Sequence, residues 1–299
     1  MRYLFFFALL SAFVANAQDK PVVVSLLGVK YYEPKRSSEA QAKLEADLAA
    51  AKKNFDADPS EDNYIWYGRR TGYMLRLNEA VDIFTRGLKK YPGSYRLLRH
   101  RGHRYISLRQ FDKAIADLEK AEKLMAGKPL DVEPDGVPNK LNKPLSSTQF
   151  NVFYHLALAH YLKGDFAKAE SVWRKCLTVC ENDDSSVAVI DWLYMTLRRQ
   201  GKEDEAKTLV ATVGDNLEII ENDSYYTRIK LYKSGNMDTR QPETPLEVAT
   251  LGYGYANWFL YTGNKETAVK MFEKVVSGSE FAAFGFIAAE AELARLRKN

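Results

Sequence analysis

The sequence has little cysteine and none of the short catalytic signatures that identify many enzymes. Only two of its 299 residues are cysteines, so a disulfide framework is excluded. It contains no phosphate-binding loop, dinucleotide fingerprint, nucleophile elbow or His-Glu-x-x-His zinc motif. Its 43 basic and 39 acidic residues leave a formal charge of only +4, which argues against a nucleic-acid-binding polycation. Fold and function must therefore be inferred from patterning.

The two cysteines, Cys176 and Cys180, lie four residues apart in a segment with helical periodicity, so they share one helix face. A disulfide between them would need off-ideal geometry. Two interpretations stay open: a pair of free, half-buried thiols, or a strained, redox-sensitive bridge. Two cysteines alone do not make a zinc site.

The N-terminus carries the one long apolar run of the sequence. Leu4–Val14 follows the basic Arg2 and precedes the small-residue pattern Ala-Asn-Ala. Its eleven residues are too few to cross a bilayer, which needs about 20. This arrangement predicts a signal peptide over residues 1–17, cleaved between Ala17 and Gln18, and it resembles the signal peptides of exported bacterial proteins. The mature chain is then periplasmic or secreted, and the alternative is a buried N-terminal helix.

Small and turn-forming residues recur along the chain at a helical-hairpin period. Two units that begin at Glu61 and Tyr95 lie 34 residues apart, and shorter matches begin near Phe150 and Val187. Glycine fills the eighth place of the first two units and alanine fills the twentieth, namely Gly68 and Ala80, then Gly102 and Ala114. Small residues at these places let the two helices of a hairpin lie close together, and large apolar residues between them fill the space to the next hairpin.

The pattern resembles the tetratricopeptide repeat family. The segment Leu-Lys-Gly-Asp-Phe-Ala-Lys-Ala at 162–169 is close to the family's central turn, and the resemblance covers most of 61–127 and 150–213. It implies an all-α, right-handed solenoid of helical hairpins. Two positions depart from the family pattern. Leu75 occupies the turn place where the family usually has glycine, and Tyr194 occupies the small eighth place of the fourth unit.

Flanking segments and one long interruption complete the predicted organisation. The predicted segments are a signal peptide at 1–17, an N-terminal extension and capping helix at 18–60, units one and two at 61–127, a long proline-rich loop at 128–149, units three and four at 150–220, and degenerate repeat-like helices with a C-terminal cap at 221–299. The loop has four prolines and no helical period, and a loop of this length is unusual in a solenoid. It is either a surface insertion or a flap over the groove.

In the tetratricopeptide family the first helix of each hairpin lines a concave groove, and the resemblance implies a set of groove residues here. This set is Trp66, Arg69, Arg96, Arg99, His100, His103, Asn151, Tyr154, His155, Tyr161, Asp191, Trp192, Arg198 and Arg199. Arginine holds carboxylate or phosphate through paired hydrogen bonds, and tyrosine and tryptophan anchor interfaces. The groove is therefore predicted to bind an anionic or carboxylate-bearing peptide segment.

Internal ion pairs are the alternative use of these arginines. Asp191 lies close in sequence to Arg198 and Arg199 and could pair with them. Arg101 and Arg104 fall outside the groove places, and we expect them to be structural.

We expect a protein–protein interaction module rather than an enzyme, with another envelope or secreted protein as partner and no nucleic acid or membrane span. No cofactor or metal is predicted. His100, His103 and His155 could bind zinc, but neighbouring arginines oppose a cation and no carboxylate offers a fourth ligand. Two alternatives remain open. One is a small-anion site or a hydrolytic enzyme with His100 or His103 as acid or base, and the other is a structural role in envelope assembly.

Overall fold

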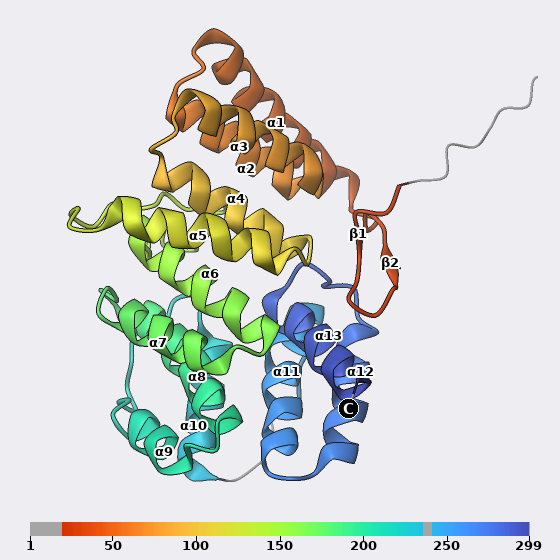
Figure 1. Cartoon of the computed structure of the whole chain (residues 1–299). Helices are drawn as coiled ribbons and strands as arrows, with labels where there is room; N and C mark the ends of the chain where they lie inside the picture. The colour runs from red at the N-terminus through yellow and green to blue at the C-terminus, as the bar shows by residue number, and fades with distance from the viewer. Residues whose placement is uncertain (1–19, 236–240, 299) are drawn as a thin grey trace, which may run out of the picture.

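The structure, a computed structural model, describes residues 20–235 and 241–298, which fold mainly into helices (Figure 1). The helices are α1 (Ser38–Ala57), α2 (Glu61–Tyr73), α3 (Leu77–Lys90), α4 (Tyr95–Ser107), α5 (Phe111–Met125), α6 (Thr148–Lys163), α7 (Phe166–Leu177), α8 (Asp183–Arg199), α9 (Glu203–Ala211), α10 (Asp223–Ser234), α11 (Pro245–Tyr261), α12 (Lys265–Val276) and α13 (Phe284–Leu296). Two short strands, β1 (Val23–Val24) and β2 (Lys30–Tyr31), pair antiparallel before α1. The predicted signal peptide, residues 1–17, lies outside the described residues. Within the described ranges, no helix is both long and apolar enough to cross a membrane.

Consecutive helices pair into hairpins, α2 with α3, α4 with α5, α6 with α7 and α8 with α9 (Figure 1). This arrangement confirms the prediction of an all-α solenoid of helical hairpins. Ser94 caps the start of α4 by accepting a hydrogen bond from the Leu97 amide at 2.9 Å. Gly102 lets α4 lie close to α5, because a Cβ at this position would fall 2.8 Å from the Cγ of Leu118.

The turn inside each hairpin uses a residue with positive φ. Gly164 and Gly201 fill this place in the third and fourth hairpins, with φ of 87° and 74°. In the first two hairpins Leu75 and Arg109 adopt φ of 59° and 60°, although a side chain in this region costs about 1–2 kcal/mol. The departure noted in the sequence at Leu75 therefore changes the residue type but not the turn.

The C-terminal helices fold back across the inner face of the solenoid. α11 packs on α8, and α13 packs on α6 and α11 (Figure 1). The Trp192 ring lies 5.2 Å from that of Tyr161 and 5.7 Å from that of Tyr253, measured between centroids, and all three side chains are buried. The second half of the solenoid is therefore closed, because α10–α13 occupy the space that an open groove would have.

The β1–β2 hairpin packs against the other end of the chain. Tyr31 stacks on Phe281 with ring centroids 5.1 Å apart and contacts Phe286 edge-to-face at 5.5 Å. The amide of Leu26 donates a hydrogen bond to Glu290 of α13. The start of the described chain is thus fixed to its last helix.

Candidate functional site

The loop between α5 and α6 lies over the predicted groove residues of the N-terminal hairpins. Arg69 donates a hydrogen bond to the Pro134 carbonyl oxygen at 2.8 Å. Arg99 forms an ion pair with Glu133 at 2.8 Å, and both side chains are buried. The structure therefore favours the interpretation of residues 128–149 as a flap over the groove.

Three further predicted groove residues contact other side chains of the protein and so are not free to bind a ligand in the way predicted. Arg96 pairs with Asp131 of the flap at 3.5 Å. Arg198 pairs with Glu203 at 3.3 Å. Trp66 is half-buried beneath two guanidinium groups of its own helix. These contacts match the alternative in which the arginines form internal pairs.

Three predicted groove residues lie in the core beneath the C-terminal helices, namely Tyr161, Asp191 and Trp192, and a fourth, Arg199, is half-buried beside α13. Asp191 pairs with Arg228 of α10. The alternative pairing of Asp191 with Arg198 and Arg199 is not among the ion pairs of the described residues. Arg199 pairs instead with Glu292 of α13. The groove prediction is corrected for Tyr161, Asp191 and Trp192, because α10–α13 cover these side chains, whereas Arg199 is engaged by its ion pair.

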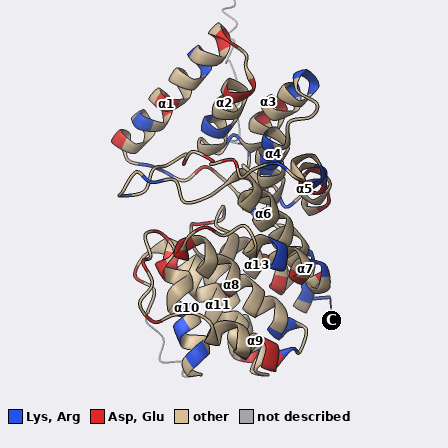
Figure 2. Cartoon of the chain, turned by 90° about the vertical axis from the view of Figure 1, so that its left-hand side faces the viewer, with Lys and Arg blue, Asp and Glu red and all other residues tan. Residues whose placement is uncertain are grey.

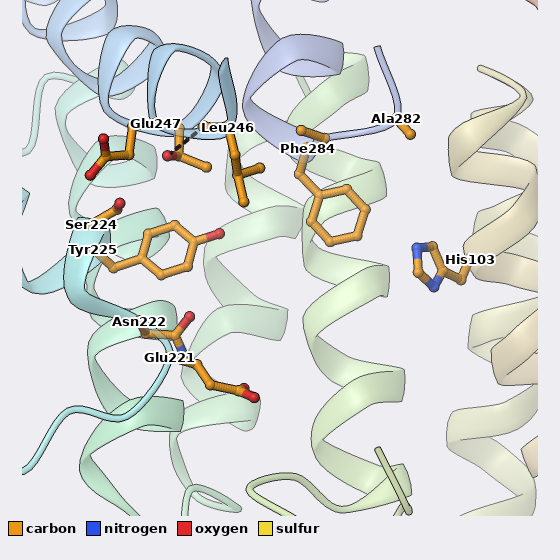
Figure 3. A pocket seen from close by; sticks show the side chains of 11 residues that line it. His103, Glu221, Asn222, Ser224, Tyr225, Leu246, Glu247, Ala282 and Phe284 are labelled. Atoms are coloured by element: carbon orange, nitrogen blue, oxygen red, sulfur yellow. Dashed lines mark hydrogen bonds between the residues drawn. The ribbon is translucent and has the colours of Figure 1, made fainter. Parts of the chain in front are cut away.

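Five of the predicted residues converge on a cleft, namely Arg99, His103, Asn151, Tyr154 and His155. Two adjoining cavities of about 310 Å³ and 330 Å³ form it, between α4 and α6 on one side and α10, α11 and the start of α13 on the other. The cavities share His103, Glu221, Asn222, Tyr225 and Phe284. Figure 3 shows the Phe284 ring between His103 and Tyr225, so this ring lies where the two cavities meet.

His103 and His155 face each other on the inner wall of the cleft. Their ring centroids are 4.5 Å apart, and each lies about 5.5 Å from the ring of Phe284. Burial, together with the charge of nearby arginines, lowers the pKa of both imidazoles well below the usual value, so both are neutral near pH 7. His100 does not line the cleft, and Phe84 stacks on its ring at 5.8 Å.

Acidic groups gather beside the cleft, at the N-terminal ends of α8 and α10 (Figure 2). Asp184 accepts hydrogen bonds from the amides of residues 220–222 at 2.8–2.9 Å, and these bonds fix the segment that leads into α10. Burial, with the nearby charge of Asp135, raises the pKa of Glu221, and burial raises that of Asp135. The cleft therefore has an arginine at its inner wall and carboxyl groups at its solvent edge.

Metal and thiol chemistry would need suitably placed histidine, carboxylate and cysteine side chains. In the described parts of the chain, no cluster of three or more His, Cys, Asp or Glu side chains is arranged to bind a metal. Cys176 is buried, Cys180 is half-buried, and both are free thiols. Burial raises the pKa of the Cys176 thiol well above its usual value, which makes it a poor nucleophile, whereas a hydrogen bond with Cys176 lowers the pKa of the Cys180 thiol.

A comparison of the sequence with models of protein families finds matches in the helices that form one wall of the cleft. Residues 96–124 and 150–183 match the model of the tetratricopeptide repeat. These two segments are tetratricopeptide repeats. The matched segments correspond to the hairpins α4–α5 and α6–α7. A comparison with curated proteins finds no significant match.

Several solved structures of tetratricopeptide repeat and other proteins have a partial likeness to this chain. YrrB, described as a TPR protein with an unusual peptide-binding site, is 17% identical with a TM-score of 0.45, over 84% of this chain and 98% of YrrB. A tetratricopeptide repeat protein from Parabacteroides merdae is 14% identical with a TM-score of 0.46, over 86% and 80% of the two chains. PilF of Pseudomonas aeruginosa is 14% identical with a TM-score of 0.47, over 80% and 86%. At these values the likeness says nothing about a ligand.

The repeat pattern could not predict the cleft residues that lie outside the four helical hairpins. Tyr225 belongs to α10, Leu246 to α11 and Phe284 to α13. The repeat register of residues 221–299 is irregular in the sequence, so no place in a unit identifies these side chains. The unusual length of the 128–149 loop was the one feature of the sequence that pointed to this part of the cleft. This loop supplies Asp135 to the lining.

Proposed function

We propose that this tetratricopeptide repeat protein is a protein–protein interaction module that binds a segment of a partner protein in its cleft. The observation that supports this best is the continuity of the two cavities, of about 310 Å³ and 330 Å³, across the ring of Phe284. Because the two cavities adjoin and share five lining residues, they offer room for an extended segment of a partner chain. Their walls combine Tyr154, Tyr225 and Leu246 with polar groups, which is the composition of protein interfaces.

The chemistry of the cleft favours a segment with an apolar or aromatic side chain and an anionic group. Leu246 is 55% exposed at the rim, and with Tyr225 and Phe284 it offers apolar contact area (Figure 3). Arg99 lines the inner end of the cleft, where an anionic group of the segment would lie. This proposal narrows the predicted anion-binding groove to the Arg99 end of the cleft.

Leu246→Arg is expected to weaken partner binding at least about tenfold, because a charged side chain would fill the rim that an apolar anchor occupies. The partner is first captured from an envelope extract with the tagged mature chain and identified by mass spectrometry. Overlapping peptides of that protein then map the bound segment, and its affinity is measured for each variant. Leu141→Arg is the matched control, because Leu141 is also 55% exposed but lines neither cavity. Equal affinity in both variants would rule out the cleft as the binding site.

We also propose that the mature chain is exported, so that the partner lies in the envelope or outside the cell. This proposal is supported by the sequence of residues 1–17, with its short apolar run and small-residue cleavage pattern. N-terminal sequencing of the protein recovered from its native host should begin at Gln18. Recovery of the uncleaved chain from the cytoplasm alone would contradict export.

A further inference from the structure

A second, smaller cavity lies behind the cleft, between α2 and α4. Its volume is about 80 Å³, well below the roughly 300–1,000 Å³ of sites for larger ligands. Its lining consists of Arg69, Tyr73, Phe84, Arg99, His100, His103 and Arg104. Arg99 and His103 also line the cleft, so the small cavity adjoins the inner wall of the cleft.

Three guanidinium groups face this cavity, and one carboxylate balances them. Arg99 pairs with Glu133 at 2.8 Å, whereas neither Arg69 nor Arg104 forms an ion pair with any described residue. Asp135, whose charge acts on Arg69, lines the cleft and not this cavity. Burial lowers the pKa of the two lining histidines, so they add no charge near pH 7. Arg69 and Arg104 thus have no ion-pair partner among the described residues, and burying unpaired charges is costly.

Hydrogen-bond donors in the cavity are left unused. The Nε of Arg99 is buried and has no partner among the described residues. Arg104 donates to the ring of His103, at 2.9 Å from Nδ1. The hydroxyl of Tyr73 accepts a hydrogen bond from Arg69 at 3.4 Å, which leaves its own proton available to donate. Burial, with the charges of Arg99 and Arg69, lowers the pKa of Arg104 to about 10, as expected for a guanidinium without a counter-charge.

Two glycines let the backbone approach the cavity closely. A Cβ at Gly72 would fall 2.7 Å from the Nη1 of Arg104, and a Cβ at Gly136 would fall 1.6 Å from the hydroxyl oxygen of Tyr73. Gly72 therefore lets the Arg104 guanidinium lie against α2, and Gly136 lets the flap contact Tyr73. The cavity is lined by side chains of α2, α3 and α4, and the flap contacts two of them, Arg69 and Tyr73, at Gly136.

We infer that this cavity binds a doubly charged tetrahedral oxyanion, that is, a phosphate or sulfate group. Its two negative charges would balance the two uncompensated positive charges, and its four oxygens would accept from guanidinium groups that converge from two helices. The inference deepens the proposed function, because it names the anionic group that the inner end of the cleft receives. The group arrives from the cleft, either as a free anion or as part of a partner molecule.

Isothermal titration calorimetry of the mature chain with inorganic phosphate and with sulfate, at constant ionic strength, tests this inference. Both anions should bind saturably. Arg104→Gln should weaken phosphate binding about tenfold or more, because it removes a charge-assisted hydrogen bond. Arg86→Gln is the matched control, since Arg86 is exposed on α3, and it should leave the affinity unchanged. Glu133→Gln should tighten binding several-fold, because it removes the competing carboxylate, and a purely structural role of Glu133 would not produce this gain.

Tyr73→Phe gives the same test if Arg104→Gln does not fold, because it removes one hydroxyl donor and should weaken phosphate several-fold. Phenyl phosphate separates the two sources of the group. Binding tighter than that of inorganic phosphate indicates a phosphoryl group carried by a partner, and binding of the inorganic anions alone indicates a free anion. Absence of saturable binding, or an affinity unchanged in the folded variants, would overturn the inference. The titration contains no partner protein, so its failure leaves the Leu246→Arg experiment unaffected.

Discussion

Replacement of Asp191 by alanine is expected to lower the free energy of unfolding by about 3–5 kcal/mol, the usual cost of breaking a buried ion pair. Asp191 and Arg228 are 0% and 1% exposed, and the Nε of Arg228 donates to the carboxylate at 2.8 Å. Without that carboxylate the guanidinium stays buried, with the Thr250 carbonyl as its described acceptor. Urea unfolding followed by circular dichroism measures the loss.

A double variant and a surface variant control for this experiment. Asp191→Leu combined with Arg228→Met should recover most of the stability, because apolar side chains of similar volume need no counter-charge. Asp215→Asn removes an exposed partner of Lys233 and should leave the unfolding curve unchanged. A loss for Asp191→Ala no larger than that for Asp215→Asn would show that α8 and α10 do not depend on this pair.

The hairpins could be predicted because their signals are local. A small residue at a helix contact and a turn residue at the tip act within one unit, so Gly102 and Gly164 have a meaning without the rest of the chain. The predicted starts of the first two units, Glu61 and Tyr95, are the first residues of α2 and α4. Residue type does not always predict the turn. Leu75 adopts the turn conformation, with a φ of 59°, although it is not glycine.

The groove residues could not be separated from the core by pattern alone. A concave place of a repeat and a place beneath a packed helix can both hold large aromatic side chains, as Tyr161 and Trp192 do. What decides between them is whether another helix covers the position. The partner of Asp191 lies 37 residues along the chain, and that of Arg199 lies 93 residues along. Pairs at these separations leave no local trace in the sequence.

The flap and the small cavity also depend on contacts that a local sequence pattern does not predict, although they involve the first two hairpins. Arg104 falls outside the groove places and was expected to be structural, yet it lines the small cavity. Arg101, interpreted in the same way, does pair inside its own hairpin, with Asp117 at 2.7 Å. Gly72 makes the difference, because it leaves room for the Arg104 guanidinium on the neighbouring helix. No pattern within α4 can reveal this.

Glu290→Ala is likewise expected to lower the free energy of unfolding by about 3–5 kcal/mol, because it unpairs a buried arginine. Arg109, in the turn of the second hairpin, donates to the Glu290 carboxylate of α13 at 2.7 and 3.0 Å. It also donates to the carbonyl oxygens of Ser107 and Phe281. These bonds hold Arg109 at a φ of 60°, a conformation that costs about 1–2 kcal/mol. The pair therefore fixes the N-terminal hairpins to the last helix.

A local effect should distinguish Glu290→Ala from Asp191→Ala. The amide of Leu26 also donates to the Glu290 carboxylate, so its loss should loosen the β1–β2 hairpin and let trypsin cleave after Lys30. Limited proteolysis and urea unfolding together measure both effects. Glu266→Ala, which removes an exposed partner of Lys270 on α12, should change neither. A variant that keeps wild-type stability and an uncut Lys30 would show that the closed arrangement does not need this carboxylate.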